Sequence, residues 1–260
     1  MRWLAPEAVA GDSLSDDEVR VFENYVRRRL DREPTQLIVG KWAFHDVEVN
    51  VRSPVLVPRP ETEELVDLVL DWWGPRPARV VDVGCGTGCI GLAILEALPP
   101  GSSCLALDVD DAALDLAREN GRGRRGYETK RRAAAHPKPD DDPVVDFIVS
   151  NPPYIPTADY LRLEPEVIDY EARLALDGGN DGLDVVRDLV LAAPTYLDPA
   201  SSRTLWLELD VAHPPLLADP RARAALLPPT TATTIADVQA ISDSSGRPRF
   251  AKVVFRPPPA

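Results

Sequence analysis

The amino-acid sequence predicts an α/β fold, in which helices cover a mostly parallel β-sheet. From Arg79 onward, apolar runs of strand length alternate with segments of helical periodicity. A glycine-rich turn at residues 84–88 directly follows the first of these runs, and the tetrapeptide at residues 151–154 follows a later one. Both turns are therefore expected at the carboxyl ends of strands, where open α/β sheets bind ligands.

The residues before this domain predict a helix and then a β-hairpin. Ser15 can cap a helix over residues 15–31, with Glu18 as its capping-box partner and an apolar stripe made of Val19, Phe22, Val26 and Leu30. Alternating valines predict a hairpin within residues 42–57, and helical spacing resumes over residues 61–73. We therefore divide the chain into a short, truncated helical segment (1–40), a β-hairpin linker (41–60) and the main domain (61–260).

The main domain is expected to contain alternating strands and helices. Strands are predicted at residues 79–83, 104–107, 144–150 and 204–209, and helices at residues 89–98, 110–120 and 183–196. The least regular stretch, residues 121–143, is expected to hold a short strand near residues 126–133. Two further strands, at residues 231–238 and 250–255, are expected to complete the sheet.

Composition excludes several classes of function. A formal net charge of -13 repels phosphate backbones, so no stable nucleic-acid partner is expected. No apolar run approaches the 18 residues that a membrane-spanning helix needs, so no membrane partner is expected either. Cys85, Cys89 and Cys104 form no disulfide framework and no zinc set with the scattered histidines. We expect a monomer without bound metal in the cytoplasm or, alternatively, in a mitochondrial or plastid matrix.

The glycine-rich turn predicts a nucleoside-containing cofactor. The turn reads Gly84-Cys85-Gly86-Thr87-Gly88, and Asp82 stands two residues before it. An acid at that place would repel a pyrophosphate but suits an ammonium, which S-adenosylmethionine carries at its methionine end. Asp108, at the tip of the next strand, can accept hydrogens from ribose hydroxyls. The alternative is a plain tight turn, with Asp108 capping the following helix.

The tetrapeptide Asn151-Pro152-Pro153-Tyr154 predicts a grip for a planar nitrogen. Its prolines lack N–H groups, so the turn presents carbonyl oxygens without competing donors. The Asn151 side-chain oxygen and the Pro152 carbonyl can accept both hydrogens of an –NH2 group, while Tyr154 offers a face for stacking. Two such acceptors can aim a poorly nucleophilic amide at a methyl donor. The alternative is a strand-terminating turn with a surface tyrosine.

With these motifs assembled, the chain resembles the HemK/PrmC family, the N5-glutamine methyltransferases of peptide chain release factors. The resemblance runs from Gln36 to Phe255 and is carried by residues 36–40 with 55–63, residues 147–156 and residues 175–183. It implies a seven-stranded Rossmann-like class I methyltransferase sheet whose last strand is antiparallel. It also implies S-adenosylmethionine as cofactor and, as partner, a release factor whose Gly-Gly-Gln loop carries the substrate glutamine.

The resemblance also implies roles for single residues. Gly84 to Gly88 and Asp108 would hold the cofactor with Thr62 beside its methionine portion, and Asn151 to Tyr154 would hold the glutamine amide, Asn151 also touching the cofactor. Arg59 and Glu61 would shape the cleft. The family's acidic-aromatic pair near the adenine falls at Ala135-His136 here, so His136 is a candidate for stacking on the adenine, against a plain loop.

Two other functions remain open. The tetrapeptide is shared with nucleic-acid adenine-N6 amino methyltransferases, although the acidic charge disfavours such a substrate. A non-catalytic relative that only binds a release factor is the other alternative, suggested by the irregular residues 121–143. The glycines and acids of residues 175–183 lack the spacing of a calcium loop, and Asp181 is expected to cap the next helix.

Overall fold

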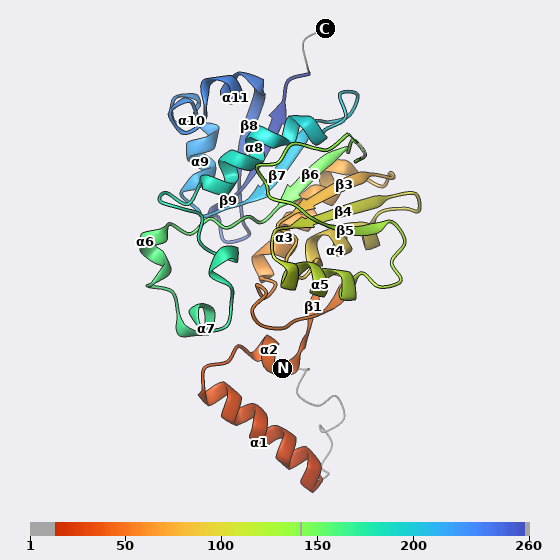
Figure 1. The fold of residues 1–260 in the computed structure, drawn as a ribbon, viewed down its shortest axis with the longest axis vertical. Helices are drawn as coiled ribbons and strands as arrows, with labels where there is room; N and C mark the ends of the chain where they lie inside the picture. Colours follow the sequence, from red (N-terminus) through yellow and green to blue (C-terminus); the bar gives the residue numbers. More distant parts are fainter. Residues whose placement is uncertain (1–13, 141, 258–260) are drawn as a thin grey trace.

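The computed structural model describes residues 14–140 and 142–257 and contains a seven-stranded sheet in the order β5-β4-β3-β6-β7-β9-β8 (Figure 1). Its strands are β3 (Arg79–Val83), β4 (Ser103–Asp108), β5 (Tyr127–Arg131), β6 (Phe147–Ser150), β7 (Thr204–Glu208), β8 (Ile235–Ser242) and β9 (Pro248–Phe255). The pairs from β5 to β7 are parallel, whereas β9 is antiparallel to both neighbours. The predicted fold class is confirmed, including the antiparallel last strand.

The centre of the sheet is the point where the direction of chain growth reverses. From β3 the chain adds β4 and β5 on one side, then returns to place β6 and β7 on the other. Strands β3 and β6 pair directly, with Val83 opposite Ser150. Gly84 and Asn151, the next residues of the two strands, therefore leave the sheet side by side at its topological switch point.

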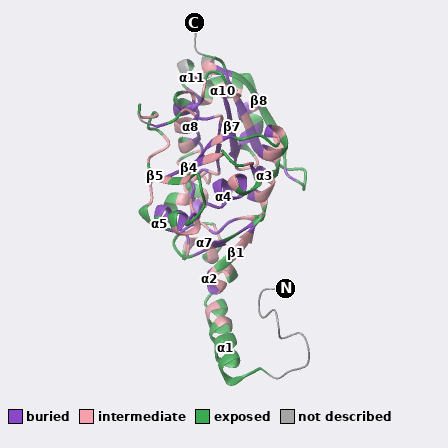
Figure 2. Ribbon diagram, turned by 90° about the vertical axis from the view of Figure 1, so that its right-hand side faces the viewer, coloured by how far each residue is buried: buried purple, intermediate pink, exposed green. Residues whose placement is uncertain are grey.

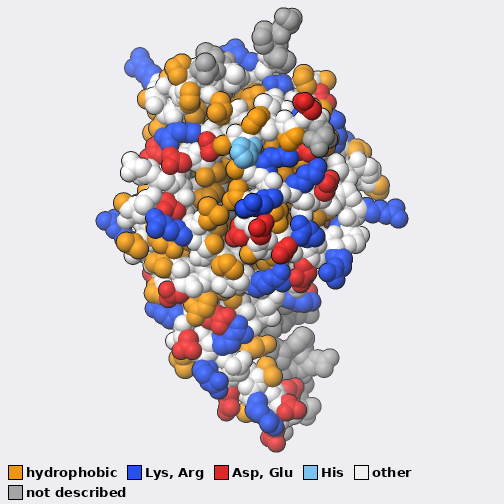
Figure 3. Space-filling model, viewed as in Figure 1, with side chains coloured by type: hydrophobic (Ala, Val, Ile, Leu, Met, Phe, Trp, Pro, Cys, Tyr) orange, Lys and Arg blue, Asp and Glu red, His pale blue; other side chains and the backbone are white. Residues whose placement is uncertain are grey.

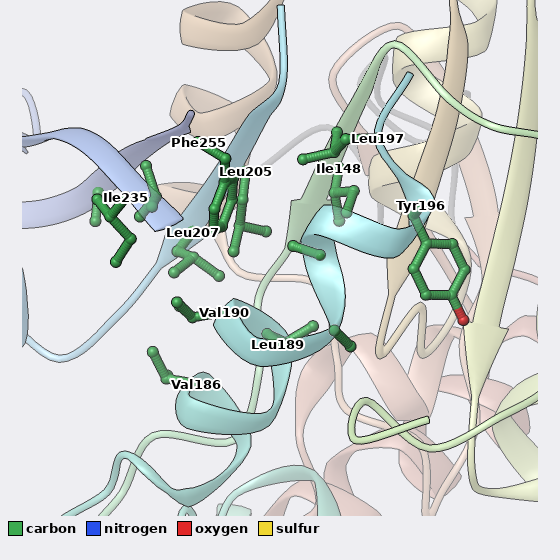
Figure 4. Packing of buried hydrophobic residues seen from close by; sticks show 14 of the residues in the cluster. Ile148, Val186, Leu189, Val190, Tyr196, Leu197, Leu205, Leu207, Ile235 and Phe255 are labelled. Carbon is green, nitrogen blue, oxygen red and sulfur yellow. The ribbon is translucent and has the colours of Figure 1, made fainter. Parts of the chain in front are cut away.

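Helices cover both faces of the sheet. One face carries α3 (Pro60–Trp73), α4 (Cys89–Ala97) and α5 (Asp111–Asn120). The other carries α8 (Asp184–Tyr196), which packs against Ile148 of β6 and Leu205 and Leu207 of β7 (Figure 4). Consecutive strand residues alternate between the faces: Phe147 packs with α3 and α4, whereas Ile148 packs with α8.

The hairpin consists of β1 (Lys41–Phe44) and β2 (Val47–Asn50), which pair antiparallel. Phe44, Val47 and Val49 are buried in the same hydrophobic cluster as α3 and α4. The hairpin is therefore confirmed, but it is shorter than predicted. Residues 51–59 continue without regular structure and lead toward the carboxyl edge of the sheet.

The N-terminal helix α1 (Asp16–Leu30) extends away from the sheet, followed by α2 (Thr35–Val39) (Figures 1 and 2). The predicted capping box of Ser15 and Glu18 is present. The predicted apolar stripe is exposed, because no residue of α1 is buried. The helix end is linked to the rest of the chain by ion pairs of Arg29 and Arg32 with Glu166.

Several short helices were not predicted. They are α6 (Thr157–Tyr160), α7 (Pro165–Ile168), α9 (His213–Ala218), α10 (Pro220–Leu226) and α11 (Pro229–Thr234), with a 3-10 turn at Arg173–Ala175. The strand predicted over residues 231–238 was wrong in its first half, since Pro229 begins α11 and β8 starts at Ile235. The irregular stretch does hold a strand, β5, as predicted.

The predicted cap of α8 was also wrong. Leu183, not Asp181, occupies the N-cap position. The Asp181 carboxylate accepts a hydrogen bond from the Leu183 backbone N–H at 3.2 Å and pairs with Arg187. It therefore stabilises the turn before the helix without capping the helix itself.

Candidate active site

A cavity of about 240 Å³ lies over the carboxyl ends of β3, β4 and β6. Three turns supply its floor: one follows β3, one follows β4 and one follows β6. The residues that these turns contribute are Gly84, Gly86, Asp108, Val109, Asp110, Asn151, Pro152 and Pro153. The predicted glycine turn, strand-tip acid and Asn-Pro-Pro segment thus share one cavity, which we call the first cavity.

The glycine turn depends on backbone conformations that favour glycine. Gly84, Gly86 and Gly88 have φ angles of +70°, +54° and +83°. A Cβ on Gly84 or Gly86 would meet nothing closer than 3.9 Å, whereas one on Gly88 would lie 2.4 Å from the Tyr127 hydroxyl. Gly84 and Gly86 therefore line open space, and Gly88 is needed for packing beneath it.

Asp108 stabilises the same turn from the neighbouring strand. Its Oδ2 accepts a hydrogen bond from the Gly86 N–H at 3.0 Å, and its Oδ1 accepts from the N–H groups of Val109 and Asp110. Burial raises the pKa of Asp108, and these hydrogen bonds oppose that rise. The following helix is capped by Asp110 and not by Asp108.

Asp82 is not part of the cavity lining. It is fully buried on β3, where its Oδ2 accepts a hydrogen bond from Gly91 N–H at 3.0 Å in α4. Burial raises its pKa to about 7. Because the side chain points into the packed face between β3 and α4, this geometry does not support direct contact with a ligand ammonium.

Other predicted residues also lie outside the cavity. Cys85 and Thr87 are buried within the turn, and Thr62 is buried on α3. His136, the candidate for stacking on an adenine, is exposed and does not line the cavity. That end of the cavity is lined instead by residues 132–134 after β5 and by Asp188 of α8.

A second cavity, also of about 240 Å³, adjoins the first. Its walls come from residues far apart in the chain: Leu56, Arg59, Asn151, Pro152, Tyr154, Ile155, Leu163, Val167, Ala175 and Leu176. Leu56, Asn151, Pro152 and Ala175 line both cavities. The tetrapeptide turn is therefore a wall shared by two cavities of different composition.

Asn151 is held by a side chain from another element. Its Nδ2 donates a hydrogen bond to the Thr62 Oγ1 at 3.2 Å. Because Nδ2 is engaged in this way, the amide Oδ1 remains available as an acceptor. Burial raises the pKa of Tyr154 to about 12, so its phenol remains neutral near pH 7.

Residues 175–183 support the tetrapeptide turn from behind. Ile155 donates its N–H to the Leu176 carbonyl at 3.0 Å, and Gly178 donates its N–H to the Ile155 carbonyl at 2.9 Å. A Cβ on Gly178 would lie 2.7 Å from the Pro153 carbonyl oxygen, and one on Gly182 would lie 2.2 Å from that of Tyr154. Glycine is required at both places because the two backbones touch.

Arg59 lines the second cavity and is fixed by Glu171, as expected for a residue that shapes the cleft. The Arg59 guanidinium lies 2.5 Å from the Glu171 carboxylate, which also accepts a hydrogen bond from Val57 N–H. Glu171 is buried, and burial raises its pKa. Glu61 lines neither cavity.

Several residues of the second cavity were not predicted from the sequence. Leu163 and Val167 lie on or beside α7, whose four residues are too few to show a helical period. Glu171, the buried partner of Arg59, carries no local pattern that distinguishes it from an exposed acid. The only local signal was Pro165 at the first position of α7.

The described residues give no indication of a metal or membrane site. Residues 14–140 and 142–257 contain no group of three or more His, Cys, Asp or Glu side chains that could hold a metal ion. Over the same ranges, no helix is both long and apolar enough to cross a bilayer. On the face shown in Figure 3, basic and acidic side chains are interspersed instead of separated into fields of one sign.

The sheet order, the antiparallel last strand and the cavity at the switch point define a class I methyltransferase fold. Two solved structures share it: a methyltransferase from Pyrococcus furiosus (TM-score 0.54, 15% identity, 93% of this chain and 98% of that chain) and the catalytic domain of hMettl16 (TM-score 0.55, 17% identity, 95% and 85%). A family profile described as "Methyltransferase small domain" matches residues 66–200.

Curated relatives indicate a narrower family than the solved structures and the family profile do. Release factor glutamine methyltransferases from Geobacter sulfurreducens and Mycolicibacterium smegmatis are 40% and 34% identical to the chain, over 76% and 92% of its length. The chain covers 67% and 81% of these relatives. The human MTRF1L release factor glutamine methyltransferase is 35% identical over 79% of the chain, which covers 64% of it. The chain belongs to the release factor glutamine methyltransferase family.

Proposed function

We propose that the protein transfers a methyl group from S-adenosylmethionine to the side-chain amide nitrogen of the glutamine in the Gly-Gly-Gln loop of a peptide chain release factor. The observation that carries this proposal is the position of Asn151, which lines both cavities. A methyl donor in the first cavity and an amide in the second would meet at that side chain.

The first cavity fits the cofactor. Gly84 and Gly86 leave open space where a side chain would otherwise stand, so a ligand can approach the backbone closely. The Asp108 carboxylate lies in the cavity at a strand tip, a place suited to ribose hydroxyls. When bound, S-adenosylmethionine would supply an electrophilic methyl group on its sulfonium.

The tetrapeptide turn would position the amide. Asn151 Oδ1 and the Pro152 carbonyl oxygen are acceptors for the two amide hydrogens, and neither proline has an N–H that could compete. Holding both hydrogens orients the nitrogen lone pair toward the methyl group, and positioning of this kind can contribute several kcal/mol to barrier lowering. Leu56 and the other apolar side chains that line the second cavity would exclude water from the amide.

A strong base is not needed in this scheme. The proton can leave the nitrogen after the methyl group has transferred, when the nitrogen has become acidic. Tyr154 is unsuited as a base, because its pKa of about 12 keeps the phenol protonated. Its role would be to present an aromatic face to the planar group.

The setting of the proposed reaction follows from the relatives, which come from bacteria and from human. A bacterial cytosol or an organelle matrix fits the proposal. The mixed surface charge and the net charge of -13 favour a protein over a nucleic acid as substrate.

The test is methyl transfer from isotopically labelled S-adenosylmethionine to a release factor. Mass spectrometry of the peptide that contains the Gly-Gly-Gln loop should show one added methyl group on the glutamine. A release factor with Gln replaced by Asn in that loop is the matched control and should remain unlabelled. Label on adenine-containing DNA with an unlabelled release factor would overturn the proposal.

A further inference from the structure

Helix α7 belongs to a wall of the second cavity and has little packing of its own. Its four residues, Pro165–Ile168, include no buried side chain. Val167 lines the cavity, and so does Leu163, two residues before the helix begins. A helix of a single turn is not stable by itself in water, because its few hydrogen bonds do not offset the entropy lost in ordering the chain. Contacts with other elements must therefore hold α7 in place.

Arginines at the end of α1 hold the outer side of α7 (Figure 1). Arg29 donates to Glu166 Oε1 at 3.1 Å, and the Arg32 Nε donates to Glu166 Oε2 at 2.9 Å. Arg32 also donates to Glu164 at 3.1 Å. Hydrogen bonding to Arg32 lowers the pKa of Glu166 to about 2, so this carboxylate is ionised at neutral pH. We call the contact of Arg29 and Arg32 with Glu166 the brace.

The backbone at Arg32 is one that arginine rarely adopts. Its φ is +65°, in the left-handed region. Arg32 directly follows Asp31, the C-cap of α1, and the Glu33 N–H donates to the Arg28 carbonyl at 3.1 Å. This pattern is a Schellman motif, in which glycine usually occupies the left-handed position. A glycine would form the same turn without steric cost, but it could not supply the charge that reaches Glu166.

The end of α1 is itself fixed to the core of the main domain. Arg28 donates to the carbonyl oxygens of Leu37 and Ile38 at 3.1 Å each, and it also pairs with Glu33. Leu37 is buried in the same hydrophobic cluster as residues of α3 and α4. The brace therefore starts from a part of the chain that is anchored to the core.

The segment before α3 holds the residues that follow α7. The Ser53 hydroxyl donates to the Tyr170 carbonyl at 2.7 Å, and the Ala172 N–H donates to the Pro54 carbonyl at 2.7 Å. The Tyr170 hydroxyl donates to the Asp31 carbonyl at 3.0 Å, so this residue contacts both supports. The wall of the second cavity is thus held from two directions.

We propose that the brace fixes the position of α7 and thereby the shape of the second cavity beside Val167. Arg29, Arg32 and Glu166 are positioning residues, since they line neither cavity themselves. This inference rests on the proposed function, in which the second cavity receives the substrate glutamine. Helix α7 contributes no residue to the first cavity, so the brace acts on binding of the release factor and not on binding of the cofactor.

The experiment uses Glu166→Gln, Arg32→Asn and the double variant of the full chain. Asparagine tolerates the left-handed conformation, so Arg32→Asn removes the charge and keeps the turn. Glu166→Gln should raise KM for the release factor about 3- to 10-fold, because a network of ion pairs is lost and the wall must be ordered on binding. The kcat and the affinity for S-adenosylhomocysteine should be nearly unchanged. Since both residues act through one contact, the double variant should be little worse than Glu166→Gln alone.

The matched control is Glu48→Gln, which breaks an exposed ion pair with Lys41 across the hairpin (3.0 Å) and should keep the wild-type KM. Salt screens exposed charges, so the ratio of KM between Glu166→Gln and wild type should fall toward one from about 0.05 M to about 0.5 M salt. Effects that multiply in the double variant would indicate that Glu166 contacts the release factor directly, and would overturn the inference. An unchanged KM in Glu166→Gln, or a ratio that does not depend on salt, would do the same.

A second readout does not depend on the substrate. Hydrogen exchange of the free protein should be faster at the amides of residues 163–171 in Glu166→Gln and Arg32→Asn, but not in Glu48→Gln. Thermal unfolding identifies any variant that fails to fold, and Arg29→Gln, which removes one pair only, would then replace it. If the wild-type protein fails to methylate a release factor, the proposed function fails while hydrogen exchange still tests the brace. Identical exchange of these residues in all variants would contradict the inference.

Discussion

The two cavities that meet at Asn151 are built in different ways. The floor of the first is formed by turns at the ends of strands, where the main polar contact joins Gly86 to Asp108 on the adjacent strand. The second is formed by loops and short helices brought together from distant parts of the chain. Its central ion pair joins Arg59 to Glu171, 112 residues apart in sequence.

This difference has a consequence for function. The floor of the first cavity is set by the parallel sheet and the glycine turn, at the place where α/β sheets bind ligands. The second depends on contacts between loops, which tolerate change more readily than strands do. We therefore expect that substitutions on one side alter cofactor binding and substitutions on the other alter the protein substrate, with Asn151 affecting the reaction itself.

The largest effect is expected from Gly182→Ala. The new Cβ would lie 2.2 Å from the Tyr154 carbonyl oxygen and would displace the tetrapeptide turn. A displacement of about 1 Å can cost about 100-fold in rate, so kcat should fall by at least that factor. Gly246→Ala is the matched control, because its φ is also positive (+81°) but no atom lies within 4 Å of its Cβ. Equal losses of activity in both variants would contradict this reading.

On the cofactor side, Asp108→Asn should weaken S-adenosylhomocysteine binding. The carboxylate holds Gly86 N–H and two further N–H groups, and an amide cannot accept at both of its atoms. Loss of a charge-assisted hydrogen bond of about 1.5 to 3 kcal/mol corresponds to about 10- to 100-fold in affinity. Calorimetry measures the affinity, and KM for the release factor should not change. A raised KM with intact cofactor affinity would show that the two sides are not separable.

On the substrate side, Arg59→Met should raise KM for the release factor and leave cofactor binding unchanged. It removes the partner of the buried Glu171 carboxylate and so loosens the wall of the second cavity. We expect KM for the release factor to rise about tenfold, equivalent to about 1.4 kcal/mol, with unchanged S-adenosylhomocysteine affinity. Arg59→Lys retains a positive charge and should lose less. A variant whose only defect is weaker cofactor binding would refute the assignment of this side.

The last prediction concerns stability and pH, and no change in the methylation reaction is needed to test it. Burial raises the pKa of Glu208 from 4.5 to about 7, so the folded protein binds more protons than the unfolded chain between these values. The contribution of Glu208 to the free energy of unfolding is therefore fully present below pH 4.5 and is lost as pH rises through about 7. Glu208→Gln should therefore become more stable relative to wild type from pH 5 to pH 8, by about 1 to 3 kcal/mol. Urea unfolding of both proteins at pH 5 and pH 8 measures this change in relative stability. If the stability of Glu208→Gln relative to wild type falls from pH 5 to pH 8, the raised pKa of Glu208 is excluded.

The same contrast explains what could be predicted from the sequence. Strands β3, β4 and β6 and the turns after them were predicted because apolar runs and glycine spacing are local signals. Helices α6 and α7 were not, because four residues carry no period. Helix α1 and its apolar stripe were also predicted from periodicity, but periodicity indicates a face without showing what covers it, and here the stripe is exposed.

Asp82 shows a second reason why part of the site could not be predicted from the sequence. Its charge and its place before the glycine turn suggested a contact with a ligand, but the residue lies within β3 and not after it. Side chains within a strand point into the packed faces of the sheet, and Asp82 points at α4. The residues that the sheet contributes to the cavity stand at the last position of a strand, as Asp108 does, or directly after it, as Gly84 and Asn151 do.

The central claim is that Asn151 joins the two cavities and acts on the reaction, not on cofactor binding. The direct test measures S-adenosylhomocysteine affinity and release-factor methylation for Asn151→Ala. We expect the affinity to stay within a few-fold of wild type while kcat falls about 100- to 1000-fold, as when one of two positioned hydrogen-bonding groups is removed from an active site. Methylation near the wild-type rate, or a loss of cofactor affinity that accounts for the whole defect, would contradict the claim.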